Sequence, residues 1–320
     1  MGFWDFLKSL FGSKKGPSPQ PGPSPAPTPT PAPAPAPPPG PPASSSPGLS
    51  VSGPVRYGAA LTANGLERVK ARLGVGEAEI WTVLTVEAKG VGFMPSRLPY
   101  ILYERHIFSK ETARRYDESH PDISNRQPGG YVGGAGEYPR IVKAAGLDYV
   151  AALRSASWGA AQVMGFNAPG LEYPSVEVFV DRLRTSEDEH LESFMRFIVL
   201  NGLTAPLKAH DWRGFAKIYN GPNYEAGGYH TKLANAYAKF SSAPSMNLDL
   251  RAAQLYLGYL GYDPKGIDGL WGPGTKGALT AFLTAHGQSL PPGGLTGLPS
   301  GALDLLAAEV GRLPPPAWPL

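Results

Sequence analysis

The chain has 320 residues, of which 42% are hydrophobic and 36 are proline, and its formal net charge is +3. This length allows more than one domain, and the weak positive charge, without a basic stripe of interleaved aromatics, does not predict nucleic-acid binding. The absence of cysteine excludes disulfides, zinc–thiolate sites and cysteine nucleophiles. No apolar run approaches the roughly 18–20 residues of a membrane span.

The first 15 residues, "MGFWDFLKSLFGSKK", predict an amphipathic helix. Phe3, Trp4, Phe6, Leu7, Leu10 and Phe11 recur at helical spacing, with lysines elsewhere. Such a helix suits contact with a membrane surface, and docking on another protein is the alternative. The apolar stretch is short and a lysine splits it, so we expect no cleaved signal peptide.

Residues 16–55 predict a linker, because most of this stretch alternates proline with small residues and carries no charge. Proline at this density holds a chain in polyproline II at ~3.1 Å per residue, giving a semi-rigid spacer on the order of 100 Å long. No basic residue accompanies a PxxP core, so a tether is favoured over an SH3-type ligand.

Residues 56–241 show mainly helical patterning. In the first predicted helix, Asn64 three residues before Glu67 suggests a capping box, and Gly74 suggests the stop. The next helix is predicted over 77–88, and the segment 97–108, "RLPYILYERHIF", is the best strand candidate. Further helices are expected near 137–146, 147–156, 175–201, 211–219 and 228–240.

Glu87 lies on the apolar stripe of the predicted helix 77–88, since Ile80, Val83 and Leu84 precede it at helical spacing. Desolvation and the negative end of the helix dipole both favour the protonated carboxyl. A proton held near neutral pH is what a general acid needs to protonate a departing glycosidic oxygen. The alternative is a glutamate turned to solvent at a fraying helix end.

Glu104 is a second candidate acid. In a strand, Glu104 and His106 would share one face and Arg105 the other. An ionised carboxylate there could activate water or stabilise an oxocarbenium ion; the alternative is a structural glutamate paired with arginine or amides. His106, Asp117 and His120 match no usual metal-ligand spacing, so no metal site is predicted.

Two further stretches are candidates for a polar, aromatic cleft. Residues 155–167, "SASWGAAQVMGFN", place Trp158, Gln162 and Asn167 among small residues, although tight helix packing explains the same pattern. Residues 212–224, "WRGFAKIYNGPNY", end a helix beside Tyr219 and Tyr224. A smaller unit over 246–312 predicts a helix at 248–259, a glycine-rich turn and a helix from Thr275, and residues 313–320 are expected to form a loose tail.

The stretches "VEAKGVGF", "ILYERHIF", "SASWGAAQVMGFN" and "FAKIYNGPNYEAGGYHTKLANAY", in this order, resemble the N-acetylmuramidase family of phage endolysins. The family usually has serine after its first glutamate, where this chain has Ala88. The resemblance implies a lysozyme-like domain, mainly α with a small β-hairpin region, and places Glu87 and Glu104 on the catalytic acids. It also assigns substrate-binding residues, which are Ser157, Gln162, Asn167, Tyr219 and Asn220. Trp158 joins them as a candidate because a tryptophan ring can stack on a pyranose face.

Residues 246–312 resemble a small all-α, three-helix peptidoglycan-binding domain through "LGYLGYDP", "IDGLWGPGT" and "ALTAF". Leu283 replaces the usual glutamine after the last phenylalanine. The resemblance assigns wall-binding residues, which are Gln254, Tyr262, Asp268, Trp271 and Thr275. Asp268 can lock the turn by hydrogen bonds, and Thr275 can cap the following helix.

The resemblances together predict a monomeric peptidoglycan hydrolase that cleaves the bond between N-acetylmuramic acid and N-acetylglucosamine without metal or organic cofactor. A wall-binding module would raise its effective substrate concentration by tethering. The protein would be made in a host cytoplasm and act on the cell wall, or be carried by a virion. The alternatives are a lytic transglycosylase acting on the same bond and a non-catalytic wall-binding or virion structural protein.

Overall fold

A computed structural model describes residues 55–88, 91–220, 224–225 and 227–320 of the chain. The predicted N-terminal helix, at residues 1–15, and nearly all of the predicted linker, at 16–55, lie outside this range and remain predictions. Within the described residues, no helix combines the length and the apolar character that crossing a bilayer would need.

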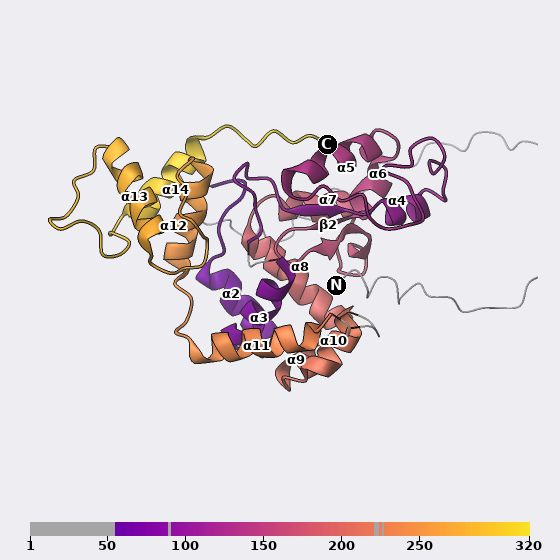
Figure 1. The fold of residues 1–320 in the computed structure, drawn as a ribbon, viewed down its shortest axis with the longest axis horizontal. Helices are drawn as coiled ribbons and strands as arrows, with labels where there is room; N and C mark the ends of the chain where they lie inside the picture. The colour runs from indigo at the N-terminus through magenta and orange to yellow at the C-terminus, as the bar shows by residue number, and fades with distance from the viewer. Residues whose placement is uncertain (1–54, 89–90, 221–223, 226) are drawn as a thin grey trace, which may run out of the picture.

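The first body is mainly helical and falls into two lobes around one long central helix, α8 (Figure 1). The lower lobe contains α2 (Ala63–Leu73), α3 (Glu77–Ala88), α9 (Thr204–Lys208), α10 (Trp212–Asn220) and α11 (Tyr229–Ser242), of which α2 packs against α8 (Glu187–Leu200) and α3 against α11. The upper lobe contains α4 (Arg105–Glu111), α5 (Glu137–Ala145), α6 (Tyr149–Arg154), α7 (Val176–Leu183) and the short 3-10 turns η1 (Gly134–Gly136) and η2 (Gly165–Asn167).

A small antiparallel sheet lies in the upper lobe, in the order β1 (Ile101–Tyr103), β2 (Ala156–Trp158), β3 (Val163–Met164). Ile101 pairs with Trp158 and Tyr103 with Ala156. The prediction of a mainly α fold with a small β-hairpin region is therefore confirmed. The strand candidate over 97–108 was too long, because only three of its residues pair and α4 begins at Arg105.

Local hydrogen bonding explains where several predicted helices begin and end. Helix α2 is capped by the Thr62 side chain, which accepts from the Gly65 backbone N–H, so the predicted capping role of Asn64 was wrong. Gly74 ends this helix in the left-handed conformation, as predicted. The single helix predicted over 175–201 is two helices, since the Ser186 side chain accepts from the Glu189 N–H and begins α8.

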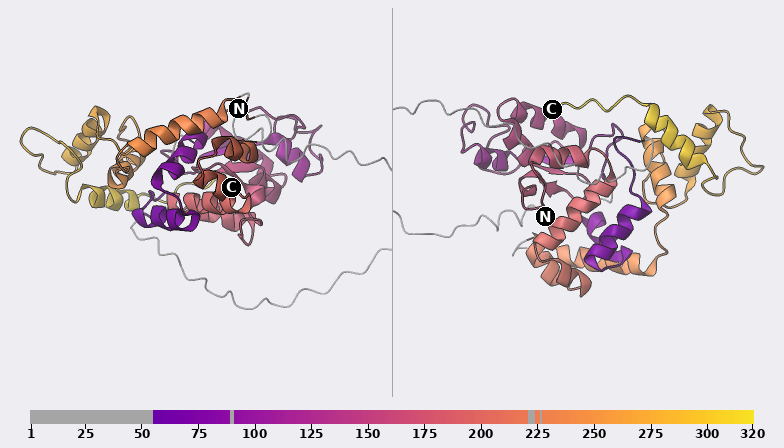
Figure 2. Two further views of the ribbon diagram at one scale, coloured as in Figure 1. Left: turned by 90° about the horizontal axis from the view of Figure 1, so that it is seen from below. Right: turned by 180° about the vertical axis from the view of Figure 1, so that it is seen from behind.

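A second body follows, in which α12 (Leu248–Tyr259), α13 (Pro273–Ala285) and α14 (Ala302–Arg312) surround a core of their own. We call residues 246–312 the three-helix unit. Its core also takes in Val55, Ala60 and Phe93 of the first body, so the two bodies share buried apolar surface. Figure 2 shows the unit against the first body in two further views. Because burial is shared, the unit is docked rather than separate.

A buried ion pair crosses the junction between the bodies. Arg251 of α12 contacts both carboxylate oxygens of Glu187 at the start of α8, at 2.5 and 2.9 Å, and both side chains are 3% exposed. The Tyr259 hydroxyl donates to the Gly58 carbonyl at 2.9 Å, and the Ala60 N–H donates to the Tyr256 hydroxyl at 3.1 Å. These directional contacts fix the orientation of α12 on the first body.

The C-terminal tail, residues 313–320, is not loose. It runs from α14 back to the upper lobe of the first body (Figure 1). The guanidinium carbon of Arg184 lies 4.0 Å from the centroid of the Trp318 ring, which is also near the rings of Tyr138 and Trp158. Arg97 also donates to the Pro314 carbonyl. Aromatic and cation–π contacts therefore bind this segment, which composition alone had marked as irregular.

Candidate active site

Helix α3 carries the first predicted acid. Ile80, Val83 and Leu84 are each at most 4% exposed, so the predicted apolar stripe does face the core. Burying each such side chain contributes roughly 1.5–3 kcal/mol. The helix ends at Ala88, which puts Glu87 in its last turn, as predicted. The side chain of Glu87 lies outside what the structure describes.

The second predicted acid, Glu104, is fully buried and sits at the N-cap of α4. The Tyr131 hydroxyl donates to its Oε1 at 2.7 Å, and His106 Nδ1 lies 2.7 Å from its Oε2. The strand alternation predicted for this segment was wrong, yet Glu104 and His106 still meet because His106 lies in the first turn of α4. We call Glu104, Tyr131 and His106 the acid cluster.

Tyr131 reaches the acid cluster from a glycine-rich loop that the sequence analysis did not single out. Burial, and the hydrogen bond to Glu104, raise the pKa of the Tyr131 phenol well above its usual range. The phenol therefore remains a donor at all ordinary pH values. The ring is 44% exposed, so one end of Tyr131 faces solvent while its hydroxyl holds the buried carboxylate.

Glu137, at the start of α5, organises this loop and was also missed. Its Oε1 accepts from the backbone N–H groups of Val132 and Gly133 at 2.7 and 2.8 Å, and its Oε2 accepts from Arg140 at 2.6 Å. The segment "PGGYVGGAGE" supplied a usable signal, because glycine pairs flank Tyr131 and Val132. Gly133 has a φ of 80°, a left-handed conformation that glycine adopts without strain.

Two of the predicted cleft residues form a linked pair at the β2–β3 turn. The Ser157 hydroxyl donates to Gln162 Oε1 at 2.9 Å, and Gln162 Nε2 donates to the carbonyls of Gly159 and Tyr100 at 2.8 and 3.3 Å. Ser157 is fully buried and Gln162 half-buried. Ser157 can therefore orient Gln162, and Gln162 is the member of the pair that can reach a ligand.

The remaining predicted sugar-binding residues have different surroundings. The Trp158 indole is 1% exposed and donates to the Leu153 carbonyl, so its ring faces the core. Asn167 is half-buried in η2. The Tyr219 ring is 1% exposed and packs between aromatic rings of α10 and α11. Asn220 ends α10, and its side chain lies outside the described part of the chain.

The residues predicted to bind the wall mostly organise the three-helix unit from within. Gln254, 1% exposed, accepts from the N–H groups of Asp268 and Gly269 and donates to Asp268, Thr275 and the Leu270 carbonyl. The predicted lock by Asp268 is present, since its carboxylate also accepts from the Leu270 N–H. Thr275 is the third residue of α13, whose N-cap is Gly272, so it is not the cap that was predicted.

Tyr262 and Trp271 are partly buried against the core of the three-helix unit. The Tyr262 ring meets Phe282 edge-on, with centroids 5.6 Å apart.

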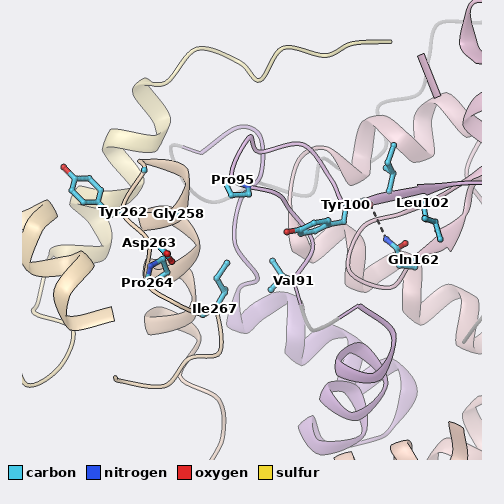
Figure 3. Close-up of a pocket in the computed structure, with 13 residues that line it drawn as sticks. Val91, Pro95, Tyr100, Leu102, Gln162, Gly258, Tyr262, Asp263, Pro264 and Ile267 are labelled. Carbon is cyan, nitrogen blue, oxygen red and sulfur yellow. Dashed lines mark hydrogen bonds between the residues drawn. The ribbon is translucent and has the colours of Figure 1, made fainter. Parts of the chain in front are cut away.

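A cavity of about 640 Å³ lies between the two bodies. The first body contributes Val91, Pro95, Tyr100, Ile101, Leu102 and Gln162, and the three-helix unit contributes Gly258, Gly261, Tyr262, Asp263, Pro264, Gly266 and Ile267. We call this cavity the junction groove. In Figure 3 the Tyr100 ring points toward the three-helix unit, and the Tyr262 ring points away from the first body.

No cluster of three or more histidine, aspartate or glutamate side chains suited to a metal ion occurs among the residues that the structure describes. His106 belongs to the acid cluster, Asp117 accepts from Ser124 at 2.7 Å, and His120 contacts Ser119. These three side chains thus have separate partners.

Comparison with known proteins identifies relatives of the first body. The family model of N-acetylmuramidase matches residues 76–241. Four solved chains match, and one is the crystal structure of the Burkholderia AP3 phage endolysin, with 41% sequence identity and a TM-score of 0.54. That match covers 57% of this chain and 72% of the endolysin chain. No curated protein matches.

Proposed function

Since the chain belongs to the N-acetylmuramidase family and is an endolysin-like glycoside hydrolase of peptidoglycan, we propose that it cleaves the β-1,4 bond between N-acetylmuramic acid and N-acetylglucosamine. Glu87 is the general acid in this proposal. Glu87 belongs to the last turn of α3, and a carboxyl at the negative end of a helix dipole is favoured in its protonated form. The protonated acid donates to the leaving glycosidic oxygen.

The acid cluster is the observation that carries the proposal. Among the residues that the structure describes, Glu104 is a buried carboxylate whose partners are a phenol and an imidazole rather than an arginine or a lysine. Structural carboxylates in the same body are paired with guanidinium groups, as Glu137 is with Arg140. A negative charge in a low-dielectric site acts strongly on a nearby developing cation. Glu104 therefore stabilises the oxocarbenium-like transition state.

Direct activation of water by Glu104 fits the geometry less well. Its carboxylate is fully buried, with Oε1 accepting from Tyr131 and Oε2 lying 2.7 Å from His106 Nδ1 without a hydrogen bond among the described residues. For water to reach it, the glycine-rich loop would have to move Tyr131 away. We therefore assign Glu104 an electrostatic role and Tyr131 the role of holding it in place.

The sugar-binding and wall-binding assignments are part of the same proposal. Gln162 contacts the sugar, with Ser157 orienting it, while Asn167 and Asn220 complete the walls of the cleft and the buried Tyr219 supports them from behind. Trp158 and the buried side chains Gln254 and Thr275 maintain the fold around the binding surfaces. Residues 56–241 form the catalytic domain and 246–312 a wall-binding module. The segment 1–15 contacts a membrane surface, and deleting it should reduce liposome binding by the full chain.

The test compares wild type and Glu87→Gln in turbidity reduction of permeabilised cells, followed by mass spectrometry of the released fragments. Loss of a general acid lowers the rate by roughly 10²–10⁴-fold, and hydrolysis leaves reducing ends. Glu77→Gln is the matched control, because Glu77 is half-buried at the other end of the same helix. Full activity of Glu87→Gln would contradict the assignment, and anhydro-muramic ends would show a lytic transglycosylase instead.

A further inference from the structure

We propose that the junction groove binds the glycan strand beyond the scissile bond, so that the three-helix unit forms one wall of the substrate site. This inference rests on the proposed function and extends it. A module that acts only as a tether needs a flexible connection and a separate binding surface. Here the module is docked, and its edge from Gly258 to Ile267 faces the catalytic domain across a shared cavity.

Two residues of the groove wall lie close in the chain to the two candidate acids. Leu102 lines it from β1, two residues before Glu104, and Val91 lines it from the loop that follows α3, four residues after Glu87. Gln162, the residue assigned to sugar contact, lies in the groove wall and donates to the Tyr100 carbonyl (Figure 3). A strand bound with its scissile bond beside the acid cluster would therefore extend along the groove toward the three-helix unit.

The lining of the groove suits a sugar chain. The Tyr100 ring offers an aromatic face and a hydroxyl, and Val91, Pro95 and Ile267 supply apolar contacts (Figure 3). Gln162 offers an amide, and such mixed surfaces recognise pyranose rings by their apolar faces and polar edges. A volume of about 640 Å³ lies within the range of roughly 300–1,000 Å³ that is usual for ligand sites.

The two walls are held in fixed positions, which is what a shared site requires. The buried pair of Arg251 and Glu187 anchors α12, and the Tyr259 hydroxyl ties the same helix to Gly58. Gly258 lies one residue before Tyr259 in α12, so the groove edge belongs to a rigid element. A glycan in the groove would contact both bodies without any rearrangement of the junction.

A substitution at Gly258 can fill the groove without disturbing the helix that carries it. Gly258 is helical with an ordinary φ, and a Cβ added there would meet no atom within 4 Å. Gly258→Leu therefore places a side chain in the groove without strain. Gly277→Leu is the matched control, because Gly277 is also helical, also has open space around it and lies in α13 outside the groove lining.

The experiment measures KM and kcat of the full-length chain on soluble, peptide-free glycan strands, long and short. We expect Gly258→Leu to raise KM for long strands about tenfold, equivalent to ~1.4 kcal/mol of binding. Short fragments that fill only the cleavage site should be unaffected, as should Gly277→Leu on every substrate. A pure tether predicts no change on soluble strands, because tethering matters only on insoluble wall.

Equal KM values for Gly258→Leu and Gly277→Leu on long strands would overturn the inference. An effect confined to peptide-bearing strands would also overturn it, because the groove would then bind the stem peptide. If Gly258→Leu does not fold, Pro95→Trp narrows the groove from the exposed opposite wall and carries the same expectations. Failure of the proposed function would look different, since wild type would then release no reducing ends from any strand.

Discussion

Two buried glutamates, each at the beginning of a helix, have very different surroundings. Glu187, at the junction between the bodies, accepts from Arg251 and from the backbone N–H groups of Gly92 and Leu61. Glu104, in the acid cluster, has a phenol and an imidazole. Burial raises the pKa of Glu187, but the Arg251 guanidinium and these hydrogen bonds outweigh burial, so the pKa lies below its usual value.

The difference separates a structural carboxylate from a functional one. The partners of Glu187 are a permanent cation from the other side of the junction and main-chain groups of its own body. The partners of Glu104 are a phenol on a glycine-rich loop and an imidazole, neither of which is a permanent cation. A carboxylate that must act on positive charge developing in a substrate needs partners of the second kind, and a junction needs the first.

Removing charge from the two glutamates should therefore give opposite results. Glu187→Gln leaves the Arg251 guanidinium buried without its counter-charge, which should lower the free energy of unfolding by about 3–5 kcal/mol. Glu104→Gln keeps an acceptor for Tyr131, so it should cost less than about 1 kcal/mol while lowering turnover severely. Urea unfolding and turbidity assays measure both. A Glu187→Gln variant as stable as wild type, or a fully active Glu104→Gln variant, would contradict the assignment of a structural role to Glu187 and a functional role to Glu104.

The junction should also be sensitive to acid through His190, which packs beside Glu187 and Arg251 and stacks on Phe93. Burial lowers the pKa of His190 to about 4, although Glu187 opposes this shift. Between that value and the ordinary 6.5, the unfolded chain binds a proton that the folded chain does not. The free energy of unfolding is thus undiminished above pH 6.5 and falls by about 3 kcal/mol on acidification to pH 4.

Urea unfolding from pH 7 to 4 checks this expectation, with His190→Gln as the comparison. Glutamine can still accept from the Ala160 N–H and donate to the Leu183 carbonyl, as the ring does. The variant should therefore lose less stability than wild type across this range. Glu187 affects stability at lower pH than His190 does. Because its pKa is depressed in the folded chain, its contribution to the free energy of unfolding falls only below about pH 4.5. Parallel pH profiles would exclude His190 as the cause.

The sequence predicted helices well where an apolar period and a stop signal agree. The bounds of α3 and α12 match the predictions, and Gly74 ends α2 as expected. The sequence-based prediction was wrong where tertiary contacts determine the secondary structure. The segment that carries Glu104 is apolar and β-branched enough to suggest a strand, but the pairing of β1 with β2 ends at Tyr103 and α4 begins.

The candidate site was predictable by residue type and not by contact. The apolar stripe of helix 77–88 indicates Glu87, and the family resemblance indicates both Glu87 and Glu104. Tyr131, by contrast, lies 27 positions from Glu104 in the chain and meets it only through the fold. The junction groove was equally hidden, since it joins Tyr100 to Gly258 across the docked unit. The prediction of a loose tail was wrong because the proline-rich composition of this segment does not indicate that Trp318 packs against the first body.

Removing the phenol from the acid cluster should have a smaller effect than removing its charge. Tyr131→Phe deletes the hydroxyl that donates to Glu104, a hydrogen bond worth about 1.5–3 kcal/mol when one partner is charged. We expect turnover to fall roughly tenfold with little change in KM. Tyr116→Phe is the control, because it also deletes one hydroxyl, which donates to the Leu147 carbonyl away from the cluster. Equal activities of the two variants would argue against a role for Tyr131.

The smallest effect is expected at the C-terminal tail, which tests whether the junction needs more than its buried ion pair. Trp318→Ala removes the ring that stacks on Arg184, and cation–π contacts of this kind contribute roughly 0.5–2 kcal/mol. Thermal unfolding should therefore show a modest loss of stability, and Pro315→Ala, at an exposed position of the same tail, should show none.

Trp318→Ala also tests how firmly the three-helix unit is held against the first body. The tail joins the end of the three-helix unit to the first body by a second route, so its loss should loosen the unit without releasing it. Added to Glu187→Gln, Trp318→Ala should then cost more than it does alone, because each contact limits the motion that the other would allow. Strict additivity of the two losses would show that the ion pair and the tail stabilise independent parts of the molecule.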